Sequence, residues 1–496
     1  MDQRSKLPPD WVLHTVPLDI WRVIFHIFHR DCSIITAASE MISLSHVCSS
    51  WRAAIKDAPE LWTKVGLVTR TNHCSIHYPS TKTELLSLVL QRSKGMPLTT
   101  MNEFSETRTR PPPAEFDLAP VELFLKATAR ARTSDLDLPA LGAVLFIFQK
   151  IDGISMQDAP PLHLLEELTL FTVYYQELPH CTELASRLWK DSTLLRTVSF
   201  SGEPICMDDV QWLESTQFPL GQLTTLTMTA DTIKAFFKLL SLTPSLVTTT
   251  IYLPSNDKFN FKNAKFVRLE ALQNLTLRAY FNEYLYGNDS EEEDGDLVEV
   301  NRKAAMRVLG FIAAPTLTTL SLRFRKRSWS VKAFEKFTDG ASSPSTIEHL
   351  SLDALGGSHE EKLECIRRLP SLRTLELTVR DRIKDVNDAQ RIGDGFWSAL
   401  REWDGESGGF ALCPRLEKLT LGYNSMSKTS IAALADMVGK RWRQSSESSN
   451  FSLLLTDADG LTKRGILTEA IAEISPLLEL KESGFKLTIK PDLPVG

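Results

Sequence analysis

A short apolar pattern returns along most of the chain and organises it. The pattern is apolar-x-x-apolar-x-apolar, and nine copies lie between residues 165 and 421, one of them with a threonine in a core position. The copies begin at Leu165, Leu195, Leu223, Leu246, Leu272, Leu317, Ile347, Leu372 and Leu416. Apolar side chains on alternate residues are typical of a strand with one buried face. We therefore expect nine short strands, one in each copy.

The spacing of the copies predicts what connects the strands. The intervals between first positions are 30, 28, 23, 26, 45, 30, 25 and 44 residues. Most copies follow a helix-like apolar segment and then a proline, as at Pro244, Pro370 and Pro414. Proline ends a helix and pushes the residue before it into extended geometry. Each unit is therefore predicted to be a helix, a proline turn and a strand, and such units are stable only when they stack. The segment from Leu85 to Ser93 followed by Leu98 is predicted to be the first helix-to-strand unit.

This repeat resembles the irregular leucine-rich repeats of F-box proteins, since leucine-rich repeats have a period of about 20–29 residues. The resemblance implies an α/β solenoid with a parallel sheet. The two long intervals require insertions, and an acidic run from Ser290 to Asp296 places one of them at residues 287–299. We expect that insertion to be a disordered acidic loop. One copy alone has asparagine, Asn424, where the family builds its side-chain ladder, so regular curvature is not predicted.

A different pattern precedes the repeats. The helix predicted after Pro17 places large apolar side chains on one face: Ile20, Ile24, Ile27 and Phe28, with Phe25 beside them. Further along come Leu44-x-x-Val47-Cys48-x-x-Trp51-Arg52 and then Pro59-Glu60-Leu61-Trp62. Residues 1–67 carry seven basic and seven acidic groups, and they are too few to bury all of these side chains. A partner or the repeats must therefore cover the remainder.

The segment resembles an F-box. It departs from the family pattern in having Val16 for the first leucine and a long loop between Arg30 and Ile42. The resemblance implies a small all-helical F-box at residues 1–67 and a leucine-rich-repeat substrate-recognition domain at residues 68–496. It also implies that a Skp-type adaptor binds Val16, Pro17, Leu18, Ile20, Ile24, Phe25, Phe28, Leu44, Val47, Cys48 and Trp51. The alternative is that these residues only cap the first repeat.

The strand positions between the apolar ones should face solvent on one side of the sheet. The first such column is almost entirely threonine and serine, whereas the second varies and contains Tyr252, Arg278, Arg323 and Asp353. Aromatic and arginine side chains are the usual anchors of protein interfaces, so we expect these four residues to bind a target protein. A merely solvated surface is the alternative. The basic run from Arg323 to Arg327 is either a reader of acidic or phosphorylated segments or a solvated loop.

The resemblance implies a non-catalytic subunit that recognises substrates for a Skp–cullin–F-box ubiquitin ligase. Its partners are then the adaptor, through it a cullin-RING ligase, and an unidentified target protein. The alternative is a leucine-rich-repeat scaffold outside any ligase. No cofactor is expected, because the sequence lacks Gly-x-Ser-x-Gly, a phosphate-binding glycine loop and His-Glu-x-x-His.

Net charge and the distribution of cysteines restrict the kinds of partner and the cellular compartment that we expect. The formal net charge of −6 gives no reason to expect nucleic-acid binding, and no apolar run approaches the length of a membrane helix. Seven scattered cysteines without a Cys-x-x-Cys pair favour reduced thiols, and hence a cytoplasmic or nuclear protein. Two groups of residues could carry chemistry. His26 and His29 with Asp31 and Cys32 have the side-chain types of metal ligands, but solvated histidines are the favoured interpretation. Cys413 could form a thioester, but an ordinary thiol within a repeat is favoured.

Overall fold

The computed structural model places most of the chain in helices and strands. The residues that it describes are 16–71, 77–79, 81–106, 119–138, 141, 160–172, 179–254, 259–261, 264–280, 304–323, 330–340, 346–353, 358–378, 392–406, 408–422, 430–444, 451–456 and 467–490. They form two compact units, residues 1–223 and 224–496. The predicted insertion at 287–299, Asn424 and the basic run beyond Arg323 lie outside the described residues.

The first unit joins an N-terminal group of helices to a sheet. The helical group contains α2 (Leu18–Asp31), α3 (Ala37–Ser45), α4 (Ser49–Lys56) and the 3₁₀ helix η1 (Pro59–Trp62). The strands are β1 (Lys64–Thr71), β2 (His77–Pro79), β3 (Leu98–Glu106), β4 (Ala131–Leu136), β5 (Glu167–Thr172) and β6 (Thr197–Gly202). The other helices are α5 (Thr83–Arg92), α6 (Ala119–Thr128), α8 (Pro179–Leu188), α9 (Met207–Ser215) and the 3₁₀ helix η4 (Leu220–Gln222). The sheet order is β2-β1-β3-β4-β5-β6, with β2 antiparallel to β1 and the other pairs parallel.

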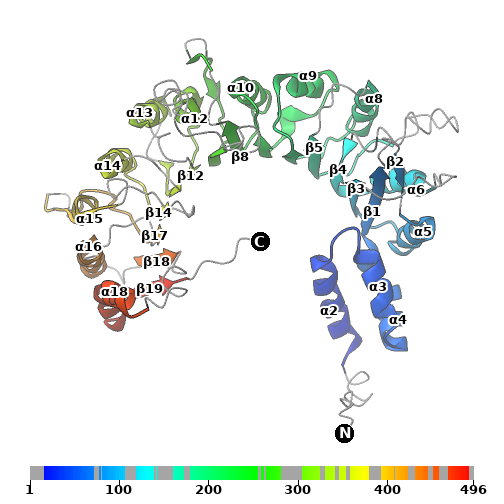
Figure 1. The fold of residues 1–496 in the computed structure, drawn as a ribbon, viewed down its shortest axis with the longest axis horizontal. Coiled ribbons are helices and arrows are strands. Elements are labelled where there is room, and N and C mark those ends of the chain that lie inside the picture. Colours follow the sequence, from blue (N-terminus) through cyan, green and yellow to red (C-terminus); the bar gives the residue numbers. More distant parts are fainter. Residues whose placement is uncertain are drawn as a thin grey trace, which may run out of the picture. The chain divides into compact units, whose positions relative to one another are not determined.

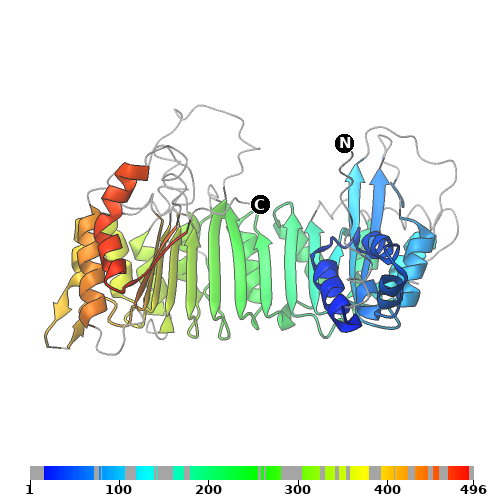
Figure 2. The same cartoon turned by 90° about the horizontal axis from the view of Figure 1, so that it is seen from below.

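The second unit is a parallel sheet in chain order. Its strands are β7 (Thr225–Thr229), β8 (Thr248–Pro254), β10 (Asn274–Tyr280), β12 (Thr319–Arg323), β13 (His349–Asp353), β14 (Thr374–Thr378), β17 (Lys418–Gly422), β18 (Ser452–Thr456) and β19 (Lys486–Ile489). Each strand pairs in parallel with the one before it in this order. Figure 2 shows these strands side by side.

Helices cover one face of the second sheet. They are α10 (Ile233–Leu242), α12 (Ala304–Arg307) with the 3₁₀ helix η6 (Val308–Phe311), α13 (Val331–Gly340), α14 (His359–Arg367), α15 (Asp394–Arg401), α16 (Ile431–Gln444) and α18 (Leu467–Glu482). Figure 1 shows α10, α13, α14, α15 and α16 along the same side of the strands. Two small sheets complete the unit, β9 (Val267–Arg268) with β11 (Ile312–Ala313), and β15 (Trp403–Asp404) with β16 (Gly409–Phe410).

The apolar pattern explains where the core lies. All nine predicted copies fall on strands, β5 to β8, β10, β12 to β14 and β17, so the mixed α/β fold with a large parallel sheet is confirmed. Their inward side chains are buried; Leu226, Leu275 and Leu320, for example, expose 1% of their surface or less. The predicted first unit is also present, as α5 followed by β3. The predicted domain boundary after residue 67 falls inside β1.

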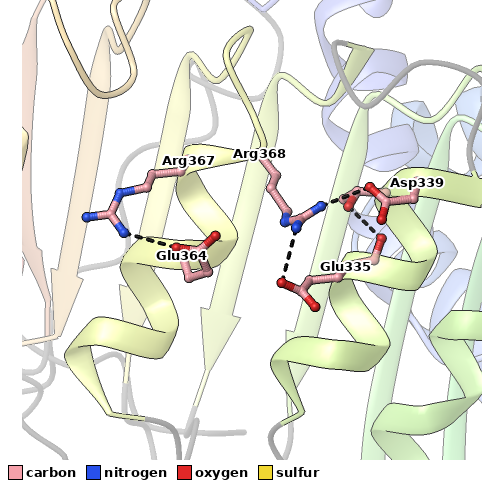
Figure 3. Close-up of polar contacts among 6 residues, drawn as sticks. Glu335, Asp339, Glu364, Arg367 and Arg368 are labelled. Carbon is pink, nitrogen blue, oxygen red and sulfur yellow. Dashed lines mark hydrogen bonds and ion pairs between the residues drawn. The ribbon is translucent and has the colours of Figure 1, made fainter.

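Neighbouring repeats are also joined on the helix side by ion pairs. Arg368, which follows α14, donates to Glu335 at 3.1 Å and to Asp339 at 2.8 Å, both on α13. Arg367 instead bonds Glu364 of its own helix at 3.0 Å. Figure 3 shows the two arginines pointing to different partners. Arg368 therefore links two repeats, whereas its neighbour stabilises only one helix.

Candidate functional site

Helix α2 carries two apolar faces, of which only one is buried. Phe25 exposes none of its surface and His29 exposes 5%. Six other large apolar side chains of the helix expose between 41% and 56% of theirs: Leu18, Ile20, Val23, Ile24, Ile27 and Phe28. Val47, between α3 and α4, exposes 55%. We call these seven residues the α2 face.

Most of the exposed large apolar side chains in the described residues belong to the α2 face. The others with comparable exposure, Met96, Leu164, Leu194 and Phe266, are far apart in the sequence. Burying a large apolar side chain contributes about 1.5–3 kcal/mol, so seven exposed together leave a considerable free energy available for association. Several exposed apolar side chains on one helix are typical of an interaction site.

The buried side of the helical group is an aromatic cluster. The ring of Trp51 lies 4.7 Å from that of Trp21 and 5.1 Å from that of Phe25, measured between centroids. The Nε1 of Trp62 donates to the carbonyl of Ile55 at 2.8 Å. This core fixes α2 against α4 and η1, so the exposed side of α2 has a defined position relative to these helices.

The structure sorts the predicted adaptor-binding residues into three groups. Five of them are on the α2 face: Leu18, Ile20, Ile24, Phe28 and Val47. Pro17 is exposed beside them, whereas Val16, Leu44, Cys48 and Trp51 are half-buried, and the Cys48 sulfur accepts a hydrogen bond from the Trp51 amide at 3.4 Å. Phe25 is in the core, where a partner cannot reach it. Val23 and Ile27 belong to the face but were absent from the predicted set, although their spacing from Ile20 and Ile24 is the signal that indicates them.

The first strand holds the C-terminal end of α2. Lys64, the first residue of β1, donates from its Nζ to the carbonyls of His29 (2.7 Å), Arg30 (2.9 Å) and Cys32 (2.7 Å). A cation at this end donates to the last carbonyls of the helix and complements the helix dipole. Burial, then the charges of Lys64 and His26, lower the pKa of His29 to about 4, so His29 is neutral at pH 7.

Two further contacts fix the helical group to the sheet. A Cβ on Gly66 of β1 would lie 3.0 Å from the Cα of Ile35, which is tighter than an ordinary contact, so glycine favours the close approach of the backbone before α3 to the strand. The guanidinium of Arg92, on α5, lies 4.3 Å from the ring centroid of Trp62. The α2 face is therefore held in a defined orientation within the first unit.

A second candidate surface lies on the helix-free face of the second sheet. The strand register places Arg278 beside Tyr252 on one side and beside Arg323 on the other, and Asp353 beside Arg323. The four predicted target-binding residues therefore form one row, the 252 row, across β8, β10, β12 and β13. Adjacent strands are about 4.8 Å apart, so the row spans roughly 14 Å. Tyr252, Arg278 and Arg323 are half-buried.

Contacts within the row order one of its arginines. The Nη1 of Arg278 donates to the Tyr252 hydroxyl at 3.3 Å, and its guanidinium lies 5.5 Å from the Tyr252 ring centroid. The neighbouring row contains the predicted hydroxyl column, with Thr250, Thr276 and Ser321 in register. The surface thus combines an aromatic ring, guanidinium groups and adaptable hydroxyls.

The groups that could have carried chemistry are unsuited to it. Burial raises the pKa of Cys413 to about 12, and a thiol that stays protonated is a poor nucleophile. Within the described residues, no group of three or more histidine, cysteine, aspartate or glutamate side chains could hold a metal ion. Nor does any helix in those ranges have the length and apolar character needed to cross a membrane.

Comparison with known proteins gives no match. No family model matches the chain, and no curated protein matches it in sequence.

Proposed function

We propose that this chain is a substrate-recognition subunit of a Skp–cullin–F-box type ubiquitin ligase. In this proposal the helical group of residues 16–62 acts as the F-box and binds a Skp-type adaptor. The strand–helix units act as irregular leucine-rich repeats that hold a target protein. The chain performs no chemistry itself; it raises the effective concentration of target lysines near the charged conjugating enzyme.

The observation that carries the proposal is the α2 face. It combines six exposed apolar side chains of one helix with Val47, on the segment whose sequence resembles an F-box. A partner that covers this face removes apolar surface that the free chain leaves in water. The three hydrogen bonds from Lys64 to the C-terminal end of α2 support the proposal in a second way, because a helix that is already fixed loses less conformational entropy when an adaptor binds.

The test is co-purification with a Skp-type adaptor co-expressed with the full chain. Replacing Ile24 and Ile27 by aspartate places two charges on the α2 face, where each would be buried without a partner at a cost of several kcal/mol. We expect the double variant to lose the adaptor. The matched control is His26→Asp, on the exposed polar side of the same helix, which should retain it.

Two outcomes would count against the proposal: a wild-type chain that binds no adaptor, or a folded double variant that still binds it. Circular dichroism establishes that each variant is folded. Adaptor binding without a cullin in the same complex would favour the alternative of a scaffold outside any ligase.

A further inference from the structure

The 252 row contains a like-charged pair in direct register. Arg278 and Arg323 are neighbours on β10 and β12, and like charges placed opposite each other on adjacent strands lower stability. Arg278 has Tyr252, and not a carboxylate, as its neighbour on the other side. Among the described residues, Arg278 forms no ion pair, whereas Arg368 and Arg373 of the same unit do.

The surrounding sheet surface supplies no negative charge near Arg278. On the helix-free face of β7, β8, β10 and β12 the other side chains are uncharged: Thr225, Thr227, Thr229, Thr248, Thr250, Tyr252, Asn274, Thr276, Thr319 and Ser321. The first acidic residue in the row is Asp353, two strands from Arg278. This part of the face is therefore a local positive surface among hydroxyl groups.

Tyr252 prepares Arg278 for an anion. Its hydroxyl accepts one guanidinium hydrogen at 3.3 Å, which orients the group and leaves its other donors for a ligand. A guanidinium presents five donors in a planar fork that fits a carboxylate. Because part of the side-chain ordering is already present in the free protein, less conformational entropy is lost on binding.

We propose that the 252 row binds an extended acidic segment of a protein, with a carboxylate of that segment on Arg278. That this protein is the ligase target rests on the proposed function. Side chains two residues apart on an extended segment lie on one side of it, so a segment with acidic residues at alternate positions turns its carboxylates toward the row. Thr250, Thr276 and Ser321 then face the segment and can bond its backbone.

The test uses the purified full-length chain and three fluorescein-labelled peptides of one length. The first alternates glutamate with threonine, the second has glutamine in place of glutamate, and the third has phosphoserine at those positions. Fluorescence anisotropy gives each affinity at low and high salt. We expect the glutamate peptide to bind and the glutamine peptide to bind at least roughly tenfold more weakly, because charge-assisted bonds are lost.

Variants locate the site. Arg278→Gln should weaken binding of the glutamate peptide about tenfold or more, and Tyr252→Phe, which removes the orienting hydroxyl, should weaken it less. Arg367→Gln is the control, since it removes the same charge from helix α14 and not from the sheet face. It should leave the affinity unchanged.

Three results would overturn the proposal: equal binding of the glutamate and glutamine peptides, unchanged binding by Arg278→Gln, or equal losses from Arg278→Gln and Arg367→Gln. Much tighter binding of the phosphoserine peptide would overturn the choice of carboxylates, since the ligand would then be a phosphorylated segment. The assay contains no adaptor, so its failure and the failure of the co-purification experiment are separate results.

Discussion

At the scale of single residues, Lys64 links the helical group to the sheet. Its ammonium group bonds three carbonyls at the end of α2, and methionine at this position would fill the space without donating. We expect Lys64→Met to lower the free energy of unfolding of the first unit by about 2 kcal/mol, since bonds to a charged donor contribute about 1.5–3 kcal/mol. Chemical denaturation followed by tryptophan fluorescence measures this.

Lys56→Met is the matched control for that substitution. Lys56 is exposed at the end of α4, so its loss should change stability by less than about 0.5 kcal/mol. Equal effects of the two substitutions would mean that the three hydrogen bonds from Lys64 to the end of α2 contribute nothing to stability.

His29 makes the same region sensitive to acid. Its pKa is about 4 in the folded chain, below the ordinary value of 6.5, chiefly because it is buried. The unfolded state therefore binds more protons between these pH values, so stability rises with pH across this window. The stabilisation is fully present above about pH 6.5 and is lost as the pH falls toward 4.

We expect His29→Leu to flatten the pH dependence of the denaturation midpoint between pH 6.5 and about pH 5. An identical slope in His29→Leu would assign the acid sensitivity to other groups.

At the scale of strands and helices, the apolar pattern predicts nine regular strands and the start of β3, but not β4, β18 or β19. In β3 and β4 the core positions that leucine occupies elsewhere are taken by Thr100, Asn102 and Ser134. All three are fully buried. Their polar groups bond within the core: the hydroxyls of Thr100 and Ser134 lie 2.7 Å apart, and Asn102 bonds the backbone of Asp137 in both directions. A search for apolar positions cannot identify pairs that become acceptable only when two strands meet.

The Thr100 and Ser134 pair gives a prediction of non-additivity. Thr100→Val leaves the Ser134 hydroxyl buried without its partner, and we expect a loss of about 1–3 kcal/mol. Adding Ser134→Ala removes that unpaired group, so the double variant should be more stable than Thr100→Val alone. A double-mutant cycle from denaturation curves measures the coupling. Simple additivity would show that the hydrogen bond contributes nothing.

Adjacent arginines after α14 test how repeats are joined. Arg368→Ala removes two bonds to α13, from a side chain that is 29% exposed, and should lower the free energy of unfolding of the second unit by about 1 kcal/mol. Arg367→Ala removes one exposed pair within its own helix and should cost less than about 0.5 kcal/mol. The reverse order would exclude Arg368 as a link between repeats.

At the scale of the whole molecule, the two candidate surfaces are in different units, so they should be separable by mutation. We expect Tyr252→Ala combined with Arg323→Ala to weaken capture of the target while adaptor binding is unchanged. Quantitative co-purification of both partners from one extract measures this. Target capture that survives the double substitution would place the target site outside the 252 row.

The two surfaces also differ in how far the sequence could define them. The 252 row follows from the repeat alone, because equal spacing within each copy puts equivalent residues in register on parallel strands. The α2 face does not, because periodicity gives the apolar side of a helix but not which part of it packs inward. Phe25 and Val23 are both apolar, and the aromatic cluster around Trp51 decides that the first is buried and the second exposed.

The order of strands in the second unit has a consequence for how the protein is made. Each strand of the parallel sheet pairs with the next strand of that sheet along the chain, so each repeat can dock as soon as it leaves the ribosome. The α2 face is synthesised long before the last repeat and stays uncovered throughout. If the cell contains no partner for the α2 face, its apolar side chains stay accessible to chaperones and proteases. The abundance of the protein should then follow the supply of that partner, even where its own gene is expressed at a constant rate.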